Sequence, residues 1–205
     1  MKRLVSFAAA LLVVFACAPR VKNLTSNGTN VIAFGDSLTA GYGAAKGEDW
    51  PSRVTAATGI PLLNAGMNGD TTESALARID EVLEQNPRIV IVALGGNDFL
   101  RGMTVTATEA NLREIVRRIQ AHGAMVMLLG FRFPSFQADY EAMYERVADD
   151  GQCFLVEGTL KGILTDRKLK SDEIHPNAAG YALMAERIAG PLQKLVKRAD
   201  AARSE

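Results

Sequence analysis

The run IVIVAL at 89–94 is apolar throughout and rich in β-branched residues, without any alternation of polar and apolar positions. A strand that is buried on both faces of a parallel sheet has this pattern. Shorter strand-like runs at 31–34, 60–65, 125–129 and 154–156 are separated by segments with helical spacing of apolar residues. Five strands that alternate with helices predict an α/β fold with a five-stranded parallel sheet.

The first two helices are predicted from their end signals. Asp49-Trp50-Pro51 is typical of a helix start and Gly59 of a helix end, with Trp50 expected to be a core residue. Thr71 or Thr72 is expected to cap the second helix. Its apolar face comprises Leu76, Ile79 and Leu83, and Pro87 is expected to close it.

Three more helices follow, at 106–121, at 134–149 and after Pro176-Asn177. The dipeptide Gly190-Pro191 is expected to interrupt the last helix, and the charged tail 197–205 is expected to fray. The domain itself is therefore predicted to span residues 30–196.

The N-terminus has the pattern of a secretory signal peptide over residues 1–17. Two basic residues precede an apolar run at 4–16, which is too short to span a bilayer as a helix. The sequence VFAC at 14–17 resembles a lipobox, which would place a lipid anchor on Cys17. Ordinary cleavage near residues 16–18 is the alternative. Either route places the mature protein outside the cytoplasm.

Composition favours one domain and argues against nucleic acid as a partner. A chain of 205 residues that is 48% hydrophobic suits a single core. Lysine plus arginine equals aspartate plus glutamate at 23 each, so there is no basic excess for nucleic acid. Residues 18–29 are polar and are predicted to form a tether. No heptad pattern is visible, so a monomer is expected.

Residues able to hold a metal or a cofactor are scarce. The chain has two histidines and two cysteines, without the spacing of a zinc site. It contains neither a GxxxxGK[ST] phosphate loop nor a GxSxG nucleophile elbow. Cys153, beside an apolar run, is predicted to be a small buried hydrophobe. No metal and no cofactor are expected.

Polar turns follow three of the predicted strands, at Ser37, Gly69 and Asn97. The carboxyl ends of parallel strands meet at one edge of a sheet, where such folds place ligands. Ser37 taken alone is most simply a helix cap.

The two histidines differ in their surroundings. His122 ends a helix, where an imidazole faces the free carbonyls. His175 lies in a loop three residues after Asp172, and a carboxylate there is able to orient the ring for general-base chemistry. Glu173 is a less favoured substitute for Asp172. The alternative to a catalytic role is that His175 is a surface residue that caps a helix.

Four segments resemble the four sequence blocks of the SGNH, or GDSL, hydrolase family: GDSLTAG at 35–41, NGDTT at 68–72, GGND at 95–98 and DEIHPN at 172–177. The segment GGNDFLRG at 95–102 is most similar to the periplasmic bacterial branch with acyl-CoA thioesterase, arylesterase and lysophospholipase activities. The resemblance implies a three-layer α/β/α, flavodoxin-like fold. It also implies a periplasmic or outer-membrane-anchored location.

The resemblance also implies catalytic roles. Ser37 becomes the nucleophile, His175 the base and then the acid, and Asp172 its orienting partner. The backbone N–H groups of Ser37 and Gly69 and the side-chain amide of Asn97 form the oxyanion hole. Two further carboxylates, Asp36 and Asp98, are expected to hold their turns through backbone hydrogen bonds instead.

The implied activity is hydrolysis of small-molecule or lipid esters and thioesters through an acyl-Ser37 intermediate. Five apolar residues are candidates for an acyl groove, although they could instead simply cover the sheet edge. They are Leu100, Met103, Phe131, Phe133 and Phe136. The alternatives are a carbohydrate O-acetylesterase with the same triad and, more remotely, a non-catalytic flavodoxin-like module that binds phosphate or FMN.

Overall fold

The computed structural model describes residues 20–131 and 138–204. Its core is a five-stranded parallel sheet with strand order β2-β1-β3-β4-β5. This arrangement confirms the predicted α/β fold. The strands are β1 (Asn30–Gly35), β2 (Leu62–Gly66), β3 (Pro87–Ala93), β4 (Met125–Gly130) and β5 (Phe154–Glu157).

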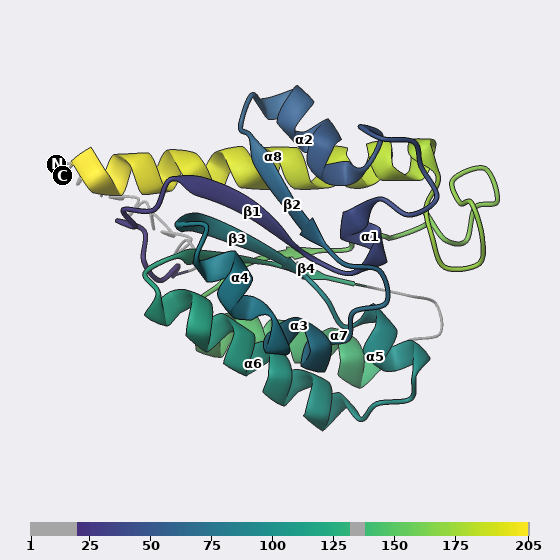
Figure 1. Ribbon diagram of the computed structural model, residues 1–205, viewed down its shortest axis with the longest axis horizontal. Helices are drawn as coiled ribbons and strands as arrows, with labels where there is room; N and C mark the ends of the chain where they lie inside the picture. Colours follow the sequence, from purple (N-terminus) through teal and green to yellow (C-terminus); the bar gives the residue numbers. More distant parts are fainter. Residues whose placement is uncertain (1–19, 132–137, 205) are drawn as a thin grey trace, which may run out of the picture.

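Helices cover both faces of this sheet. They are α1 (Ser37–Ala40), α2 (Trp50–Thr58), α3 (Thr72–Ala77), α4 (Ile79–Leu83), α5 (Gly96–Leu100), α6 (Val105–Ala121), α7 (Ala138–Gly151) and α8 (Ala178–Ser204). Figure 1 shows α2 and α8 on one side of the sheet and α3, α4, α6 and α7 on the other. The three layers agree with the fold that the sequence implied.

The unbroken apolar runs correspond to strands covered on both faces. In β3 every residue from Ile89 to Ala93 is 0% exposed, and β4 is buried along its whole length. Neither strand has a face in water, so neither sequence alternates. The edge strand β2 is more exposed and is correspondingly less apolar.

The ends of the first predicted helices agree with several local signals, but the helix after Thr71 differs from its prediction. Asp49 caps α2 by accepting a hydrogen bond from Ser52 N (2.9 Å), and Gly59 follows its last residue. Thr71 caps α3. The predicted single helix after Thr71 is wrong, because the backbone at Arg78 (φ −110°, ψ 13°) separates α3 from α4. Pro87 begins β3, a position where its missing N–H is tolerated.

The C-terminal helix does not end or fray where the sequence suggested. Helix α8 continues through Pro191 to Ser204. A proline inside a helix costs about 3 kcal/mol. Beyond it, Leu192, Leu195 and Ala199 are all 0% exposed, and each fully buried leucine contributes about 1.5–3 kcal/mol. Burial on the far side of the proline therefore outweighs the lost hydrogen bond.

The described part of the predicted tether is packed against the domain. Val21 is buried, and Lys22 N donates to Gln152 O (3.0 Å). The Asn23 side chain donates to the carbonyls of Gln120 and Ala124, both at 2.9 Å. Because these contacts satisfy polar groups at the ends of two helices, residues 20–29 belong to the fold.

The N-terminal predictions lie outside the described residues. These are the signal peptide at 1–17, the lipid anchor at Cys17 and the first residues of the tether, so they stay predictions. No helix within 20–131 and 138–204 is both long enough and apolar enough to cross a membrane.

Two predicted core residues are buried. Trp50 is 0% exposed. Cys153 is a free thiol with 4% exposure, and burial raises its pKa to about 12. A thiol with so high a pKa is protonated and unreactive at neutral pH.

Candidate active site

Ser37 is the first residue of α1 and lies two residues after the end of β1. Asp36 caps this short helix, because its carboxylate accepts from Leu38 N (2.9 Å). Gly35 leaves no room for a side chain: a Cβ there would lie 2.6 Å from Ala93 O and 2.2 Å from Thr39 Oγ1. The close approach of β1, α1 and β3 thus fixes the place of Ser37, which is 9% exposed.

His175 joins Ser37 to Asp172. Its Nε2 lies 3.0 Å from Ser37 Oγ, and its Nδ1 lies 2.8 Å from Asp172 Oδ2. This arrangement suits the tautomer in which Nδ1–H donates to the carboxylate and Nε2 accepts from the serine hydroxyl. The structure therefore brings together the three residues that the sequence proposed as a triad.

The loop that carries Asp172 is folded around its carboxylate. Asp172 Oδ1 accepts hydrogen bonds from Ile174 N and His175 N, both at 2.9 Å. Partial burial opposes ionisation of Asp172, but these backbone hydrogen bonds and the bond to the His175 ring outweigh it and lower its pKa. The carboxylate is thus held in its charged form beside the imidazole.

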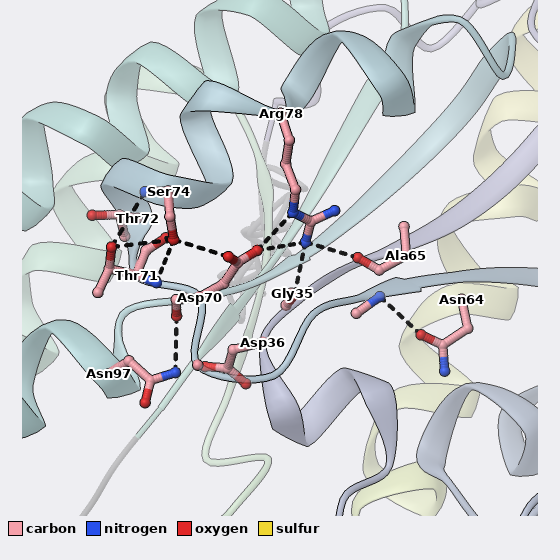
Figure 2. A network of polar contacts seen from close by, with 12 residues as sticks. Gly35, Asp36, Asn64, Ala65, Asp70, Thr71, Thr72, Ser74, Arg78 and Asn97 are labelled. Atoms are coloured by element: carbon pink, nitrogen blue, oxygen red, sulfur yellow. Dashed lines mark hydrogen bonds and ion pairs between the residues drawn. The ribbon is translucent and has the colours of Figure 1, made fainter.

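The proposed oxyanion donors come from three neighbouring turns. Gly69 has φ 82°, a left-handed conformation that favours glycine. Asn97 lies in the first turn of α5, and its Nδ2 donates to Asp70 O at 2.9 Å, as Figure 2 shows. Because each amide nitrogen carries two hydrogens, one N–H of Asn97 remains for a ligand.

Comparison with known proteins decides the family. The model of the GDSL-like Lipase/Acylhydrolase family matches residues 33–183 of the chain. The chain belongs to this family. The resemblance inferred from the four sequence blocks is thereby confirmed.

Proteins similar to this chain are named esterases or thioesterases. Thioesterase 1/protease 1/lysophospholipase L1 of Escherichia coli strain K12 is 33% identical over 175 residues, which cover 81% of this chain and 84% of that protein. Arylesterase of Vibrio mimicus is 30% identical over 198 residues, or 91% and 96% of the two chains. The crystal structure of the esterase EstA from Pseudoalteromonas sp. has a TM-score of 0.74 and 29% identity, with 82% of this chain and 98% of that chain covered.

Asp36 and Asp98, two further carboxylates of the GDSL-family blocks, are structural. Asp98 is 0% exposed and accepts hydrogen bonds from Thr72 N (2.9 Å) and from the Thr72 hydroxyl. Its carboxylate therefore stabilises the turn after β2 and not the segment after β3, in which Asp98 itself lies. The pKa of Asp36 is raised to about 7: burial is the largest cause, the charges of Asp70 and Asp98 add to it, and the hydrogen bond from Leu38 N opposes it.

A cavity of about 220 Å³ lies beside the Ser37 hydroxyl. Its apolar lining comes from Leu38, Phe99, Leu100, Leu164 and Ile174. Leu100 was predicted there. Leu164 and Ile174 were not, because they belong to the loop between β5 and α8, where no periodic pattern marks a side chain as facing a cavity.

Two of the other predicted groove residues, Phe131 and Met103, lie outside the cavity. Phe131 is 1% exposed and meets Tyr144 edge-on in the core, because it continues the buried strand β4 by one residue. Met103 closes the turn after α5 through Met103 N to Asp98 O (2.9 Å) and does not line the cavity. Phe133 and Phe136 lie outside the described residues.

Other candidate sites are not supported. Within 20–131 and 138–204, no group of three or more His, Cys, Asp or Glu residues is arranged to hold a metal ion. His122 is the C-cap of α6 and precedes β4, whereas Ser37 follows the end of β1, so the two residues lie at opposite ends of the parallel strands.

Proposed function

We propose that this chain is a serine esterase that hydrolyses carboxylic esters and thioesters through an acyl-enzyme on Ser37. The observation that carries the proposal is the continuous chain of hydrogen bonds from Ser37 Oγ through His175 to Asp172. Membership in a family whose relatives are named esterases supports the same reaction class.

Acylation begins at the Ser37 hydroxyl. His175 Nε2 takes its proton while Oγ forms a bond to the carbonyl carbon of the ester. The carbonyl oxygen becomes an oxyanion, which the N–H groups of Ser37, Gly69 and Asn97 stabilise. Collapse of this intermediate breaks the bond to the alcohol or thiol, which leaves with the proton from His175.

Deacylation repeats the sequence with water. His175 removes a proton from a water molecule as its oxygen attacks the acyl carbon, and the proton then returns to Ser37 Oγ. The product is a carboxylic acid, and the enzyme is restored. The charged Asp172 stabilises the imidazolium in both halves of the reaction.

The cavity favours an apolar acyl or aryl group over a sugar. Five of its lining side chains are apolar, and the polar ones are those of Ser37 and His175 together with Asp36, Asn97 and Glu173. A sugar ring has several hydroxyl groups that need hydrogen-bond partners when they are buried. Ester substrates with short or medium acyl chains therefore fit this site better than acetylated saccharides.

We also propose export through the signal peptide at 1–17, with Cys17 as a candidate lipid anchor. The support is the basic start and the short apolar run of the sequence. Expression of the full chain in a bacterium, followed by mass determination of the mature N-terminus, separates lipidated Cys17 from ordinary cleavage. An uncleaved N-terminus would refute both.

Labelling with a fluorophosphonate tests the nucleophile. Ser37 Oγ attacks phosphorus, fluoride leaves, and the covalent label remains on the protein. We expect labelling of the wild type and of Ser204→Ala, a control at the far end of α8, and no labelling of Ser37→Ala. Label that persists on Ser37→Ala would overturn the assignment.

A further inference from the structure

Arg78, at the break between α3 and α4, extends toward the carboxyl ends of β1 and β2 (Figure 2). Its Nη2 donates to Gly35 O (3.1 Å) and to Ala65 O (3.0 Å), and its Nε donates to Asp70 Oδ2 (2.7 Å). The side chain is 12% exposed, and its guanidinium lies 4.6 Å from the centre of the Phe34 ring. The Arg78 guanidinium therefore binds the ends of β1 and β2 and the turn that follows β2.

The acceptors of Arg78 adjoin the reaction centre. Gly35 precedes Ser37 by two residues, and Asp70 directly follows Gly69. The guanidinium has five N–H donors in a fixed plane, so it holds several acceptors at defined relative positions. Arg78 thus ties the segment that carries the nucleophile to the turn that carries the Gly69 N–H.

Asp70 extends the same network to the third donor. Its Oδ1 accepts from Ser74 Oγ (2.9 Å), and its backbone carbonyl accepts from Asn97 Nδ2 (2.9 Å). Arg78 holds the Asp70 carboxylate, so the ion pair also determines the direction of the Asp70 backbone carbonyl. The Asn97 amide, which donates to that carbonyl, therefore depends on the same ion pair. The dashed lines of Figure 2 follow this path from Arg78 through Asp70 to its neighbours.

We propose that Arg78 is a positioning residue for the oxyanion hole and that Asp70 is its partner. The inference rests on the proposed function, because the oxyanion forms only in acyl transfer. Arg78 does not line the cavity, and its effect reaches the substrate through Gly35, Gly69 and Asn97. Oxyanion stabilisation requires donors fixed in advance at hydrogen-bond distance from the developing charge.

A purely structural role for the pair has to be separated from this proposal. Buried ion pairs are weak grounds for stability, yet removal of one partner is destabilising. A destabilised variant has fewer active molecules, but each folded molecule turns over normally. A displaced oxyanion donor lowers the turnover of every folded molecule and weakens binding of transition-state analogues.

The experiment compares Arg78→Lys and Asp70→Asn with the control Arg88→Lys. Arg88 is matched in burial, with 15% side-chain exposure and an aspartate partner, Asp200, but it lies at the opposite end of the sheet in β3. Fluorophosphonate titration counts the active sites in each preparation. Rates with p-nitrophenyl butyrate and inhibition by a trifluoromethyl ketone, whose adduct with the serine carries an oxyanion, are then expressed per active site.

We expect kcat per active site to fall by about 10- to 100-fold in both test variants, because a removed donor costs about 100- to 1,000-fold and here donors are displaced. KM stays within about twofold, and inhibition by the ketone weakens in proportion to kcat/KM. Arg88→Lys keeps the wild-type values. If Arg78→Lys does not fold, Asp70→Asn decides, because it removes the same charge pair with little change of shape.

Unchanged kcat per active site, or a loss confined to the number of active sites, would overturn the proposal. Failure of the proposed function has a different signature, since it would appear as hydrolysis or labelling that survives Ser37→Ala.

Discussion

The ring of Tyr42 lies against the imidazole of His175, with ring centroids 4.5 Å apart and planes tilted by 45°. Tyr42 is 51% exposed, but its backbone is held in place, because the buried Tyr181 hydroxyl donates a hydrogen bond to Tyr42 O at 2.8 Å. The Tyr42 ring thus packs against the imidazole whose Nε2 lies beside Ser37 Oγ. Its electron-rich face also attracts the imidazolium that forms during acyl transfer.

Replacing Tyr42 tests this contact. We expect Tyr42→Leu to lower kcat/KM for p-nitrophenyl butyrate by about two- to fivefold, the size of an exposed cation–π contribution. Tyr42→Phe keeps the ring and is expected to keep the rate. Equal losses in the two variants would show that the hydroxyl, rather than the ring, matters.

Asn97→Ala removes the side-chain donor of the proposed oxyanion hole. We expect kcat to fall by about 100- to 1,000-fold with little change in KM, because the donor acts on charge that appears only in the transition state. Steady-state kinetics measure this. Asn27→Ala, an exposed residue of the N-terminal segment, is the control. Wild-type turnover in Asn97→Ala would remove Asn97 from the mechanism.

Leu164 and Ile174 are expected to set the preference for acyl chains. Truncation of either to Ala takes methylene groups from the cavity wall, and each one buried against substrate contributes about 0.8 kcal/mol. The ratio of kcat/KM for p-nitrophenyl hexanoate to that for the acetate should fall by about three- to thirtyfold. Met103→Ala, outside the cavity, should leave the ratio unchanged. An unchanged ratio in both cavity variants would place the acyl chain elsewhere.

The sequence predicted the parts of the site that depend on local pattern. Buried strands show as unbroken apolar runs, and the turns after them carry Ser37, Gly69 and Asn97 within short recognisable segments. His175 could be singled out because the chain has only two histidines, and Asp172 because it lies three residues earlier.

The parts that the sequence did not predict depend on contacts between distant residues. Arg78 falls within a helical pattern, and nothing local indicates that it reaches Gly35, 43 residues away. Helix α8 passes through Pro191 because residues beyond it are buried in the core, and Asn23 joins residues 20–29 to carbonyls about 100 positions later. Local propensity describes one segment at a time, whereas these features require the assembled fold.

The buried carboxyl of Asp36 makes the stability of the fold depend on pH. It is 2% exposed, and burial is the first of the causes that raise its pKa from an ordinary 3.8 to about 7. Between these two values the folded state binds a proton that the unfolded state releases, so unfolding becomes easier as pH rises. The free energy of unfolding therefore falls from about pH 4 to about pH 7 because of this group, and the loss is complete above that range.

Asp36→Asn is expected to remove this pH dependence. Asparagine is a good N-cap, and its side-chain oxygen is able to accept from Leu38 N in the same way, but it never has to be ionised. Relative to the wild type, the variant should gain about 2–4 kcal/mol of stability when the pH is raised from 5 to 8, since each pKa unit corresponds to about 1.4 kcal/mol. Urea unfolding of both proteins at the two pH values measures the difference, in which the contributions of titrating groups that do not interact with Asp36 cancel. A difference that is the same at pH 5 and pH 8 would show that Asp36 titrates alike in the folded and unfolded states.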